Sequence, residues 1–135
     1  MGVYSESRDA DIIGWKKVLV PRYSICVDGC DTEECMTVIA KLIIPKYAQV
    51  VFGDTKCRAS QAIVDGFYPL KYMTLSPSPD EELKILWARS ARDRETIYIP
   101  GQTVIPDLFD PDQVVTCSHG IHFFRSYPEA CCYVI

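Results

Sequence analysis

Residues 36–44 constrain the fold more than any other part of this sequence. The segment reads Met-Thr-Val-Ile-Ala-Lys-Leu-Ile-Ile, and Pro45 follows it directly. β-Branched and apolar residues favour extended backbone, and proline ends a strand ladder because it has no N–H to donate. We therefore predict a strand over residues 36–44, in the centre of a sheet.

Shorter segments of β type lie on both sides of this strand in the sequence. Each is apolar or alternating, and most end at proline or glycine. The predicted strands are residues 12–20, 23–27, 47–52, 59–68, 96–99 and 103–105. Near the C-terminus, Ser126 is followed by Pro128 and Glu129, which is typical of a helix start, so we predict a short helix over residues 126–133.

These segments together predict an α+β fold, namely a β-rich single domain with a mixed or antiparallel sheet and a short C-terminal helix. The 135 residues have the length of one domain. Residues 1–11 are polar and aperiodic, so we expect a flexible N-terminal arm there. Residues 12–135 are then the single globular domain.

Residues 80–91 carry two conflicting patterns. The serine, proline and glutamate within residues 78–81 have the form of a helix cap and first turn. Leu83, Ile85 and Trp87 instead alternate with their neighbours as they would in a strand. The local pattern by itself leans toward a helix.

Charge and composition disfavour several classes of function. Fourteen basic against eighteen acidic residues give a net charge of −4, which repels a phosphate backbone, so no nucleic-acid partner is expected. No run of about 18 apolar residues is present, so no membrane span is predicted. The N-terminus has no secretory signal pattern, and seven cysteines are an odd number, so we expect reduced thiols inside a cell. The basic residues at 16–17 and 89–94 are typical of solvated surface.

Residues 115–124 concentrate the candidate chemistry, because both histidines of the chain, His119 and His122, lie there with Cys117. Cysteine and histidine are common metal ligands, and a four-ligand set would be Cys57, Cys117, His119 and His122. Their spacing matches no recognised zinc pattern, and in a strand the two histidines would point to opposite faces unless Gly120 introduces a bulge or turn. The structural alternative is a hydrogen-bonded core His122 and a solvated His119.

A second hypothesis is a catalytic pair, in which Cys57 or Cys117 is the nucleophile and His122 the base. Lys56 and Arg58 flank Cys57 and would lower its thiol pKa through their positive charge. Against this, cysteine often serves as a small apolar side chain, and the sequence indicates no third orienting residue.

Several pieces of the sequence together resemble a known family. They are residues 39–45, residues 56–62 with Lys-Cys-Arg, residues 98–110, residues 117–124 with Cys-Ser-His-Gly-Ile-His-Phe-Phe, and a helix containing Glu129 and Ala130. This order resembles an uncharacterised domain of large DNA viruses of the marseillevirus or mimivirus kind, which also occurs at the ends of pentapeptide-repeat proteins. The resemblance runs from about Trp15 to the C-terminus and implies no established reaction.

The resemblance also sorts the candidate residues. The residues that match the family's pattern are Cys57, Arg58, Cys117, Gly120, Ile121, His122, Phe123 and Phe124. His119 falls on a variable position, which leaves Cys57, Cys117 and His122 as the preferred trio. Residues 83–91 correspond to a strand in the family, so we predict a strand there.

We therefore expect a viral protein that acts as a non-enzymatic structural or protein-interaction module and forms a homo-oligomer, a dimer above all. The residues Tyr127, Tyr133, Val134 and Ile135 are too many apolar groups for so short a tail to bury, which motivates the oligomer. The expected location is the virion and the interior of the infected host cell, with another viral or host protein as a further partner. No cofactor is expected. The alternative is a small Cys/His enzyme or metal-binding protein that uses Cys57, Cys117 and His122.

Overall fold

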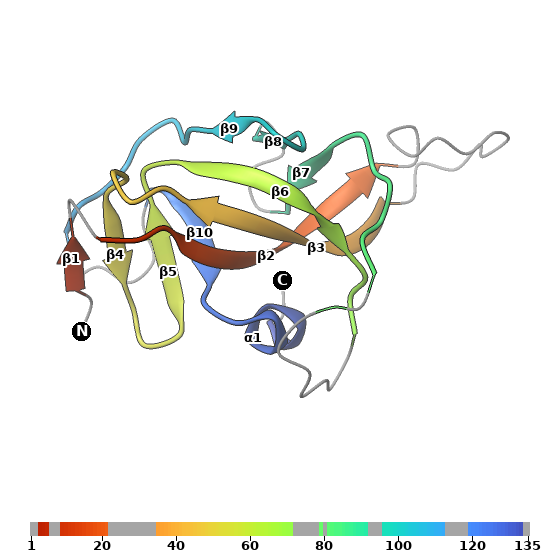
Figure 1. Cartoon of the computed structure of the whole chain (residues 1–135), viewed down its shortest axis with the longest axis horizontal. Helices are drawn as coiled ribbons and strands as arrows, with labels where there is room; N and C mark the ends of the chain where they lie inside the picture. The colour runs from red at the N-terminus through yellow and green to blue at the C-terminus, as the bar shows by residue number, and fades with distance from the viewer. Residues whose placement is uncertain are drawn as a thin grey trace, which may run out of the picture.

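The computed structural model describes residues 3–5, 9–21, 35–71, 79, 81–91, 96–112 and 119–133. These residues form one antiparallel sheet and one short helix (Figure 1). The elements are β1 (Val3–Ser5), β2 (Ile12–Pro21), β3 (Cys35–Ile44), β4 (Val50–Phe52), β5 (Lys56–Ala59), β6 (Ala62–Tyr68), β7 (Ala88–Ser90), β8 (Ile97–Tyr98), β9 (Thr103–Val104), β10 (Ile121–Phe124) and α1 (Tyr127–Cys132). The predicted β-rich fold with a C-terminal helix is confirmed, and the sheet is antiparallel.

The strand predicted from residues 36–44 lies at the centre of the sheet. Along the main path the strands follow the order β1-β4-β5-β10-β2-β3-β6-β9. β3 pairs with β2 over ten residues, from Ile12 opposite Ile44 to Pro21 opposite Cys35, and β6 covers its other edge. The prediction of a central strand is therefore confirmed.

β2 pairs with β3 along one edge, and its other edge is shared between β10 and β7. Trp15 is opposite Phe124 of β10, whereas Val18 and Leu19 are opposite residues of β7. Lys16 and Lys17 lie between these two pairings, at the point where β10 ends its contact and β7 begins. The division opens a gap beside β2 that no ladder of the described strands fills.

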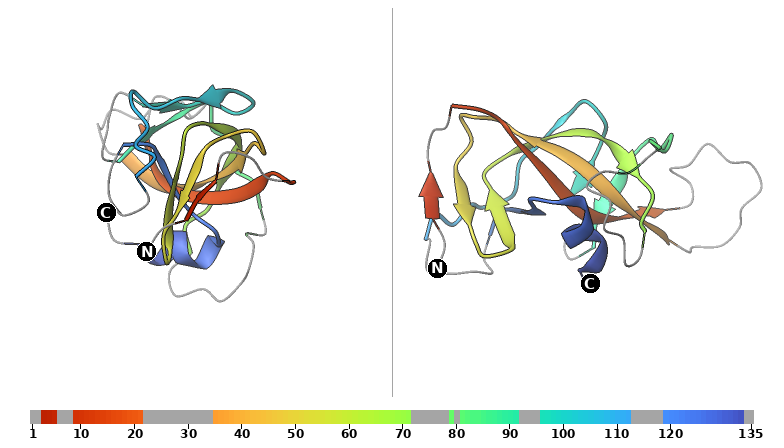
Figure 2. Two further views of the ribbon diagram at one scale, coloured as in Figure 1. Left: turned by 90° about the vertical axis from the view of Figure 1, so that its left-hand side faces the viewer. Right: turned by 60° about the horizontal axis from the view of Figure 1, so that its bottom comes forward.

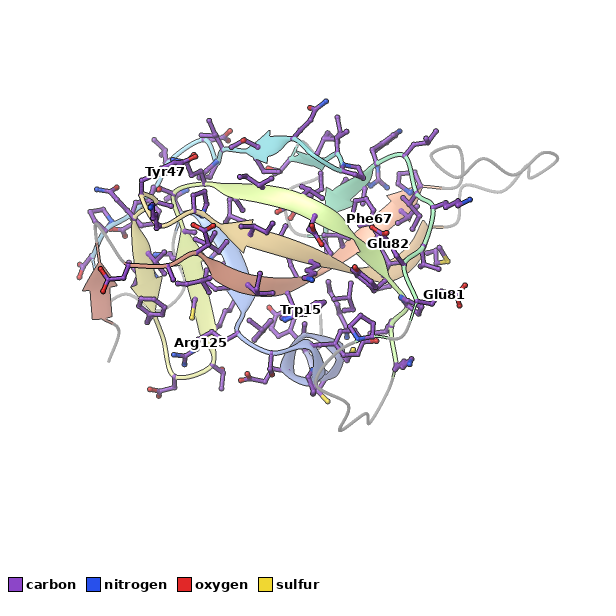
Figure 3. The ribbon with its side chains drawn as sticks, viewed as in Figure 1. Trp15, Tyr47, Phe67, Glu81, Glu82 and Arg125 are labelled. Atoms are coloured by element: carbon purple, nitrogen blue, oxygen red, sulfur yellow. The ribbon has the colours of Figure 1, made fainter. Side chains whose placement is uncertain are left out.

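Apolar side chains form one cluster on each face of the sheet. The larger cluster includes Val18 and Val38 from the two longest strands, together with Phe67 and Phe123. A side chain in a strand points to the face opposite that of its neighbour, so alternate residues of β2 and β3 supply the second cluster. That cluster contains Trp15, Ile39, Phe124, Tyr127, Ala130 and Cys131. Figure 3 shows Trp15 on the side of the sheet that carries α1.

Helix α1 begins with the predicted cap. The Ser126 hydroxyl accepts a hydrogen bond from the Glu129 backbone N–H at 3.3 Å and donates one to the Glu129 carboxylate at 2.8 Å. This reciprocal arrangement satisfies a backbone donor that the first helical turn leaves without an intrahelical partner. The prediction of a C-terminal helix is confirmed. In the second view of Figure 2, the helix lies beneath the long central strands.

The expectation that the apolar groups at the C-terminus are too many to bury is wrong for Tyr127. Tyr127 is fully buried under the sheet, and Tyr133 is half-buried against Phe124, with 5.1 Å between the ring centroids. The aromatic rings pack on the face of the sheet because α1 turns the chain back onto it. Val134 and Ile135 lie outside the described residues.

Several predicted strand boundaries differ from the structure. Residues 47–52 form a strand only from Val50, because a turn closes before it, with the Ala48 N–H donating to the Pro45 carbonyl at 2.9 Å. The Lys56–Ala59 strand is separate from the one that follows it, and β1 lies within the predicted arm and pairs with β4. Predicted strand 23–27 lies outside the described residues.

Residues 81–91 contain no helix. Ala88–Ser90 forms β7, and Leu83 makes an isolated bridge to Phe67, to which its N–H donates at 2.7 Å. The strand that the family resemblance predicts is therefore correct for its last part, and the local helix signal is wrong. The apolar residues Leu83 and Ile85 pack against the larger cluster along an extended chain.

Candidate functional site

The two pieces of the family pattern are neighbouring strands. Residues 56–59 of β5 pair with residues 121–124 of β10, so segments more than 60 positions apart in the sequence meet in register. Cys57 is opposite Phe123, and Arg58 is opposite His122. Directly opposite residues of an antiparallel pair share a face, and successive residues alternate between faces.

Cys57 and His122 therefore lie on paired strands but point to opposite faces. Cys57 packs with Phe123 in the larger apolar cluster, and burial raises the pKa of its thiol above the ordinary value of 9.0. A nucleophilic cysteine needs the opposite shift. Cys117 lies outside the described residues, so the structure says nothing of its place beside the other two.

The predicted metal set is divided in the same way. His119 is exposed, and His122 is half-buried with its Nε2 atom buried. Within the described ranges, no group of three or more histidine, cysteine, aspartate or glutamate side chains is placed to hold a metal ion. Gly120 does make a turn here, at a φ of 148°.

Arg58 has a structural role that sequence reasoning missed. Its side chain is 1% exposed, Nε donates to the Asp110 carbonyl at 3.1 Å, and Nη2 donates to the Asp112 carbonyl at 2.5 Å. The same loop is tied to the start of β10, because the Asp110 N–H donates to the His119 carbonyl at 3.0 Å. Arg58 thereby fastens the loop that follows β9 over the β5–β10 pair.

Gly120 is required where that loop returns. A Cβ atom added there would lie 3.1 Å from the Arg58 Cβ, 3.2 Å from the Phe109 ring and 3.3 Å from the Ala59 carbonyl. Its positive φ is also a conformation that other residues rarely adopt. The sequence prediction that the chain turns at Gly120 is confirmed, and the reason is close approach to Arg58.

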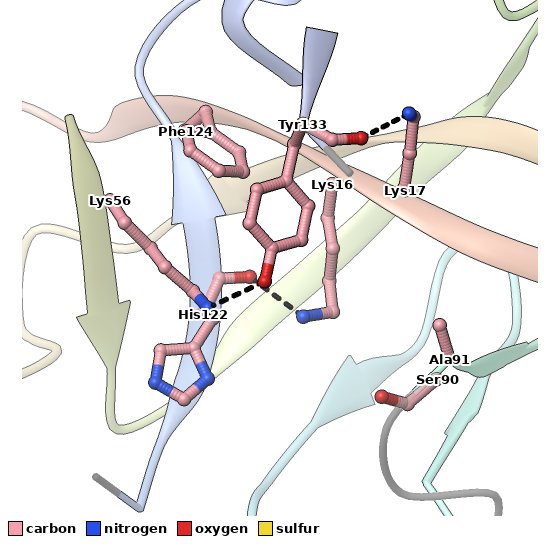
Figure 4. A pocket seen from close by; sticks show the side chains of 8 residues that line it. All are labelled: Lys16, Lys17, Lys56, Ser90, Ala91, His122, Phe124 and Tyr133. Atoms are coloured by element: carbon pink, nitrogen blue, oxygen red, sulfur yellow. Dashed lines mark hydrogen bonds between the residues drawn. The ribbon is translucent and has the colours of Figure 1, made fainter. Parts of the chain in front are cut away.

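A small basic pocket occupies the division of the sheet beside β2 (Figure 4). We call it the lysine pocket. It is lined by Lys16, Lys17, Lys56, Ser90, Ala91, His122, Phe124 and Tyr133. The lining residues come from β2, β5, β7, β10 and the residues directly after β7 and α1, so only the assembled sheet forms it.

The lysine side chains hold the pocket together through backbone and phenol oxygens. Lys16 Nζ donates to the His122 carbonyl at 3.0 Å, on the stretch of β10 that has moved away from β2. Lys56 Nζ donates to the Tyr133 hydroxyl at 3.1 Å and lies 4.8 Å from the centre of its ring. Lys17 Nζ donates to the Tyr133 carbonyl.

The lysine pocket is a local concentration of positive charge on a chain whose net charge is −4. The described residues that line it include three lysines and no aspartate or glutamate. Half-buried charges are screened by salt less than exposed ones. Sequence reasoning assigned Lys16 and Lys17 to ordinary surface, because nothing in their neighbourhood along the chain indicates Lys56 or Tyr133.

A second cavity adjoins the lysine pocket, and we call it the histidine cavity. It has a volume of about 160 Å³ and shares Lys16, Ser90 and His122 with the lysine pocket. Its other lining residues are Thr96, Tyr98, Pro106, Asp107, Leu108, His119, Gly120 and Ile121. The volume is below the roughly 300–1,000 Å³ of typical cofactor sites, so the cavity suits a small ligand.

An apolar edge lies beyond the histidine cavity. Ile97 is 38% exposed, Ile105 71% and Leu108 61%, and we call these three residues the β9 rim. β9 is the last strand of the main path, and within the described part of the chain it pairs only with β6. Leu108 lines the histidine cavity as well, so the rim and the cavity are continuous.

The structure thus defines a small antiparallel β-sheet protein with a basic pocket in a division of its sheet. No helix of the described residues is both long and apolar enough to cross a membrane. The chain belongs to a family of unknown function, DUF5758, whose model matches residues 3–130. No curated protein and no solved structure shows significant similarity to it.

Proposed function

We propose that this protein is a non-enzymatic protein-interaction module that forms a homodimer through the β9 rim. The supporting observation is the group of three exposed aliphatic side chains beside the last strand of the sheet. Exposed apolar groups that lie together are typical of interaction sites. A terminal strand adds unpaired backbone donors and acceptors, which a second chain can pair.

A second copy is the partner that this edge fits best. A two-fold axis places the same surface on both sides of an interface, so the rim of one copy meets the rim of the other. Among the described residues that line a hollow beside β9, Asp107 alone is ionisable, so self-pairing brings few like charges together. The rest of that lining is threonine, valine and isoleucine.

Light scattering on the full chain over a concentration series tests the dimer. We expect the mass of a dimer for the natural sequence and of a monomer for Ile105→Asp, because the new carboxylate is placed in an apolar contact. Met36→Asp is the matched control, since Met36 is 43% exposed and lies opposite Val20, at the end of β3 that is remote from the residues aligned with β9. A monomer at every concentration, or loss of the dimer in both variants, would contradict the proposal.

The second part of the proposal is a viral origin, with the protein carried in the particle and present in the interior of the infected host cell. It is supported by the resemblance of residues 56–58 and 117–124 to a domain of large DNA viruses. Mass spectrometry of purified particles is the test, and absence of the protein from them would contradict the virion part. Binding of another viral or host protein at the rim, with no dimer, would replace the second copy as partner.

The alternative of a small Cys/His enzyme or metal protein is weaker. Cys57 and His122 point to opposite faces of the sheet, and burial raises the thiol pKa of Cys57. Elemental analysis of the purified protein, together with the variants Cys57→Ser and His122→Ala, separates the two functions. One zinc per chain, lost in either variant while the protein stays folded, would favour the alternative.

A further inference from the structure

We propose that the hollow between β8 and β9 binds an extended peptide segment of a partner protein, which adds a strand between them. We call this hollow the strand slot. It has a volume of about 250 Å³ and is lined by Thr96, Ile97, Thr103, Val104, Ile105 and Asp107. Figure 1 shows β8 and β9 along the same rim of the sheet. The inference goes beyond dimerisation, because the ligand is one strand and its backbone is what the slot recognises.

The turn between β8 and β9 creates the slot. The two strands follow each other in the chain, but in the described part of the sheet β8 pairs with β7 and β9 pairs with β6. The Gln102 N–H donates to the Ile99 carbonyl at 3.0 Å, and Gly101 has a φ of 83°. With Pro100 at its second position this is a type II turn, whose twist splays the flanking strands instead of pairing them.

Hydrogen bonds to β6 hold this turn in place. The Gly101 N–H donates to the Val64 carbonyl at 2.7 Å, and the Val64 N–H donates to the Gln102 carbonyl at 3.0 Å. The separation of β8 from β9 is therefore fixed by backbone hydrogen bonds and by the Pro-Gly sequence of the turn.

Backbone groups on both walls are the first argument for a strand as ligand. In β8, the Thr96 carbonyl accepts from β7 at 3.0 Å, so the backbone N–H and C=O of the next residue, Ile97, point away from β7. In β9, the Gln102 carbonyl accepts from β6, so the backbone of Thr103 points away from β6. Ile97 and Thr103 both line the slot. Each wall thus offers a donor and an acceptor to an inserted strand.

Side chains around the slot indicate the chemistry of the partner. Tyr98 and Val104 are buried, whereas Ile97 and Ile105 are exposed on the other face of their strands. Residues of an inserted strand would alternate between the same two faces, and β-branched residues suit such a position. Asp107 is an exposed carboxylate beside the slot, which favours a basic residue in the ligand. The partner segment is therefore extended and β-branched, with a lysine or arginine next to its strand.

Fluorescence anisotropy of a labelled synthetic peptide, titrated with the full chain, is the test. The probe is Lys-Thr-Val-Thr-Val-Thr-Lys with blocked ends, and we expect saturable binding. The matched control is the same peptide with N-methyl groups on its three central residues, which keeps the side chains and charges but removes backbone donors. Its affinity should be lower by about tenfold or more. This comparison requires no change in the protein.

Variants at Thr103 test the wall formed by β9. Thr103→Pro removes the N–H that faces the slot, and the pairing with β6 keeps its hydrogen bonds because that N–H points away from β6. We expect the affinity for the probe to fall about tenfold. Thr103→Val is the matched control, since it keeps the N–H and the shape of the side chain, and its affinity should equal that of the natural sequence. Circular dichroism checks folding, and Ile97→Pro with Ile97→Val serves the same purpose on β8.

Asp107→Asn tests the charge, and its affinity for the probe should fall about two- to fivefold. Ile97 and Ile105 also belong to the β9 rim, so the titration is carried out below the concentration at which light scattering detects a dimer. A chain that is always a monomer would contradict the dimer alone. The peptide proposal is overturned if the probe does not bind, if the N-methylated peptide binds as tightly, or if Thr103→Val loses as much affinity as Thr103→Pro.

Discussion

Arg58 carries a positive charge into the interior and binds two backbone carbonyl oxygens of one loop. Arg125 offers a comparison, because it too donates to two backbone carbonyls. Its Nη2 donates to Gly53 at 3.1 Å and to Asp54 at 3.0 Å, but its side chain is exposed. A lost hydrogen bond costs more where water cannot replace it. At the scale of single residues, burial therefore decides which arginine matters for stability.

We predict that Arg58→Met lowers the free energy of unfolding by about 2–3 kcal/mol, because it leaves the carbonyls of Asp110 and Asp112 without this donor. Arg125→Met should change it by no more than about 0.5 kcal/mol. Urea unfolding followed by circular dichroism measures both. Equal effects of the two substitutions would show that burial of Arg58 is not what stabilises the loop.

Cys57 makes a prediction about pH. Burial raises the pKa of its thiol in the folded protein above 9.0, so at alkaline pH the unfolded chain loses this proton before the folded one does. Stability from the buried thiol is complete below pH 9 and falls as pH rises above it. The natural sequence should therefore lose more stability than Cys57→Ala between about pH 8 and pH 10, in urea unfolding at each pH. Identical pH profiles of the two proteins would contradict this assignment.

At the scale of elements, α1 holds the second apolar cluster in place. Tyr127, Ala130 and Cys131 are its buried residues, and the Trp15 ring meets Tyr127 edge to face, with 5.5 Å between the centroids. The Tyr127 hydroxyl donates to the Pro69 carbonyl at 2.5 Å, which links the helix to the chain after β6. Isolated helices as short as the six residues of α1 are not stable in water. α1 is stable because its buried side chains pack on the sheet and Ser126 caps its first turn.

The cap of α1 should therefore be measurable. We predict that Ser126→Ala destabilises the protein by about 1 kcal/mol, because the Glu129 N–H and carboxylate both lose their partner. Ser126→Thr keeps a capping hydroxyl and should lie close to the natural sequence. Thermal unfolding distinguishes the two, and a full loss of stability in the threonine variant would indicate packing at this position instead of capping.

At the scale of the whole molecule, one sheet supports both apolar clusters. β2 supplies Trp15 to the cluster under α1 and Val18 to the other, and β3 likewise supplies Ile39 and Val38. Unfolding of β2 or β3 would therefore expose apolar side chains of both clusters.

The shared strands predict cooperative unfolding. In a Trp87→Phe variant the tryptophan fluorescence comes from Trp15 alone, which packs against Tyr68 and Tyr127. It should change at the same urea concentration as the circular dichroism of the strands. Two separated transitions would show that the helix side unfolds independently of the rest. The buffer should contain reductant, so that the free thiols do not form disulfides.

Strand 36–44, its central place and the capped C-terminal helix were all predictable from the sequence. Their signals are local: a β-branched run ended by proline, and a serine followed by proline and glutamate. The turn at Gly120 was predictable for the same reason. The division between β5 and β6 was not, because residues 56–68 are compatible with strand almost throughout.

The sequence by itself determined the long central strand, most of the other extended segments, where the helix starts and which residues follow the family pattern. Only the tertiary structure decided that Arg58 fastens the loop after β9, that Cys57 and His122 face opposite ways, and that Lys16 and Lys56 share a pocket with Tyr133. The physical reason is that backbone propensity and side-chain period act between neighbours along the chain. The pairing of β10 with β5 and β2 joins distant segments, and packing of the two apolar clusters sets its register.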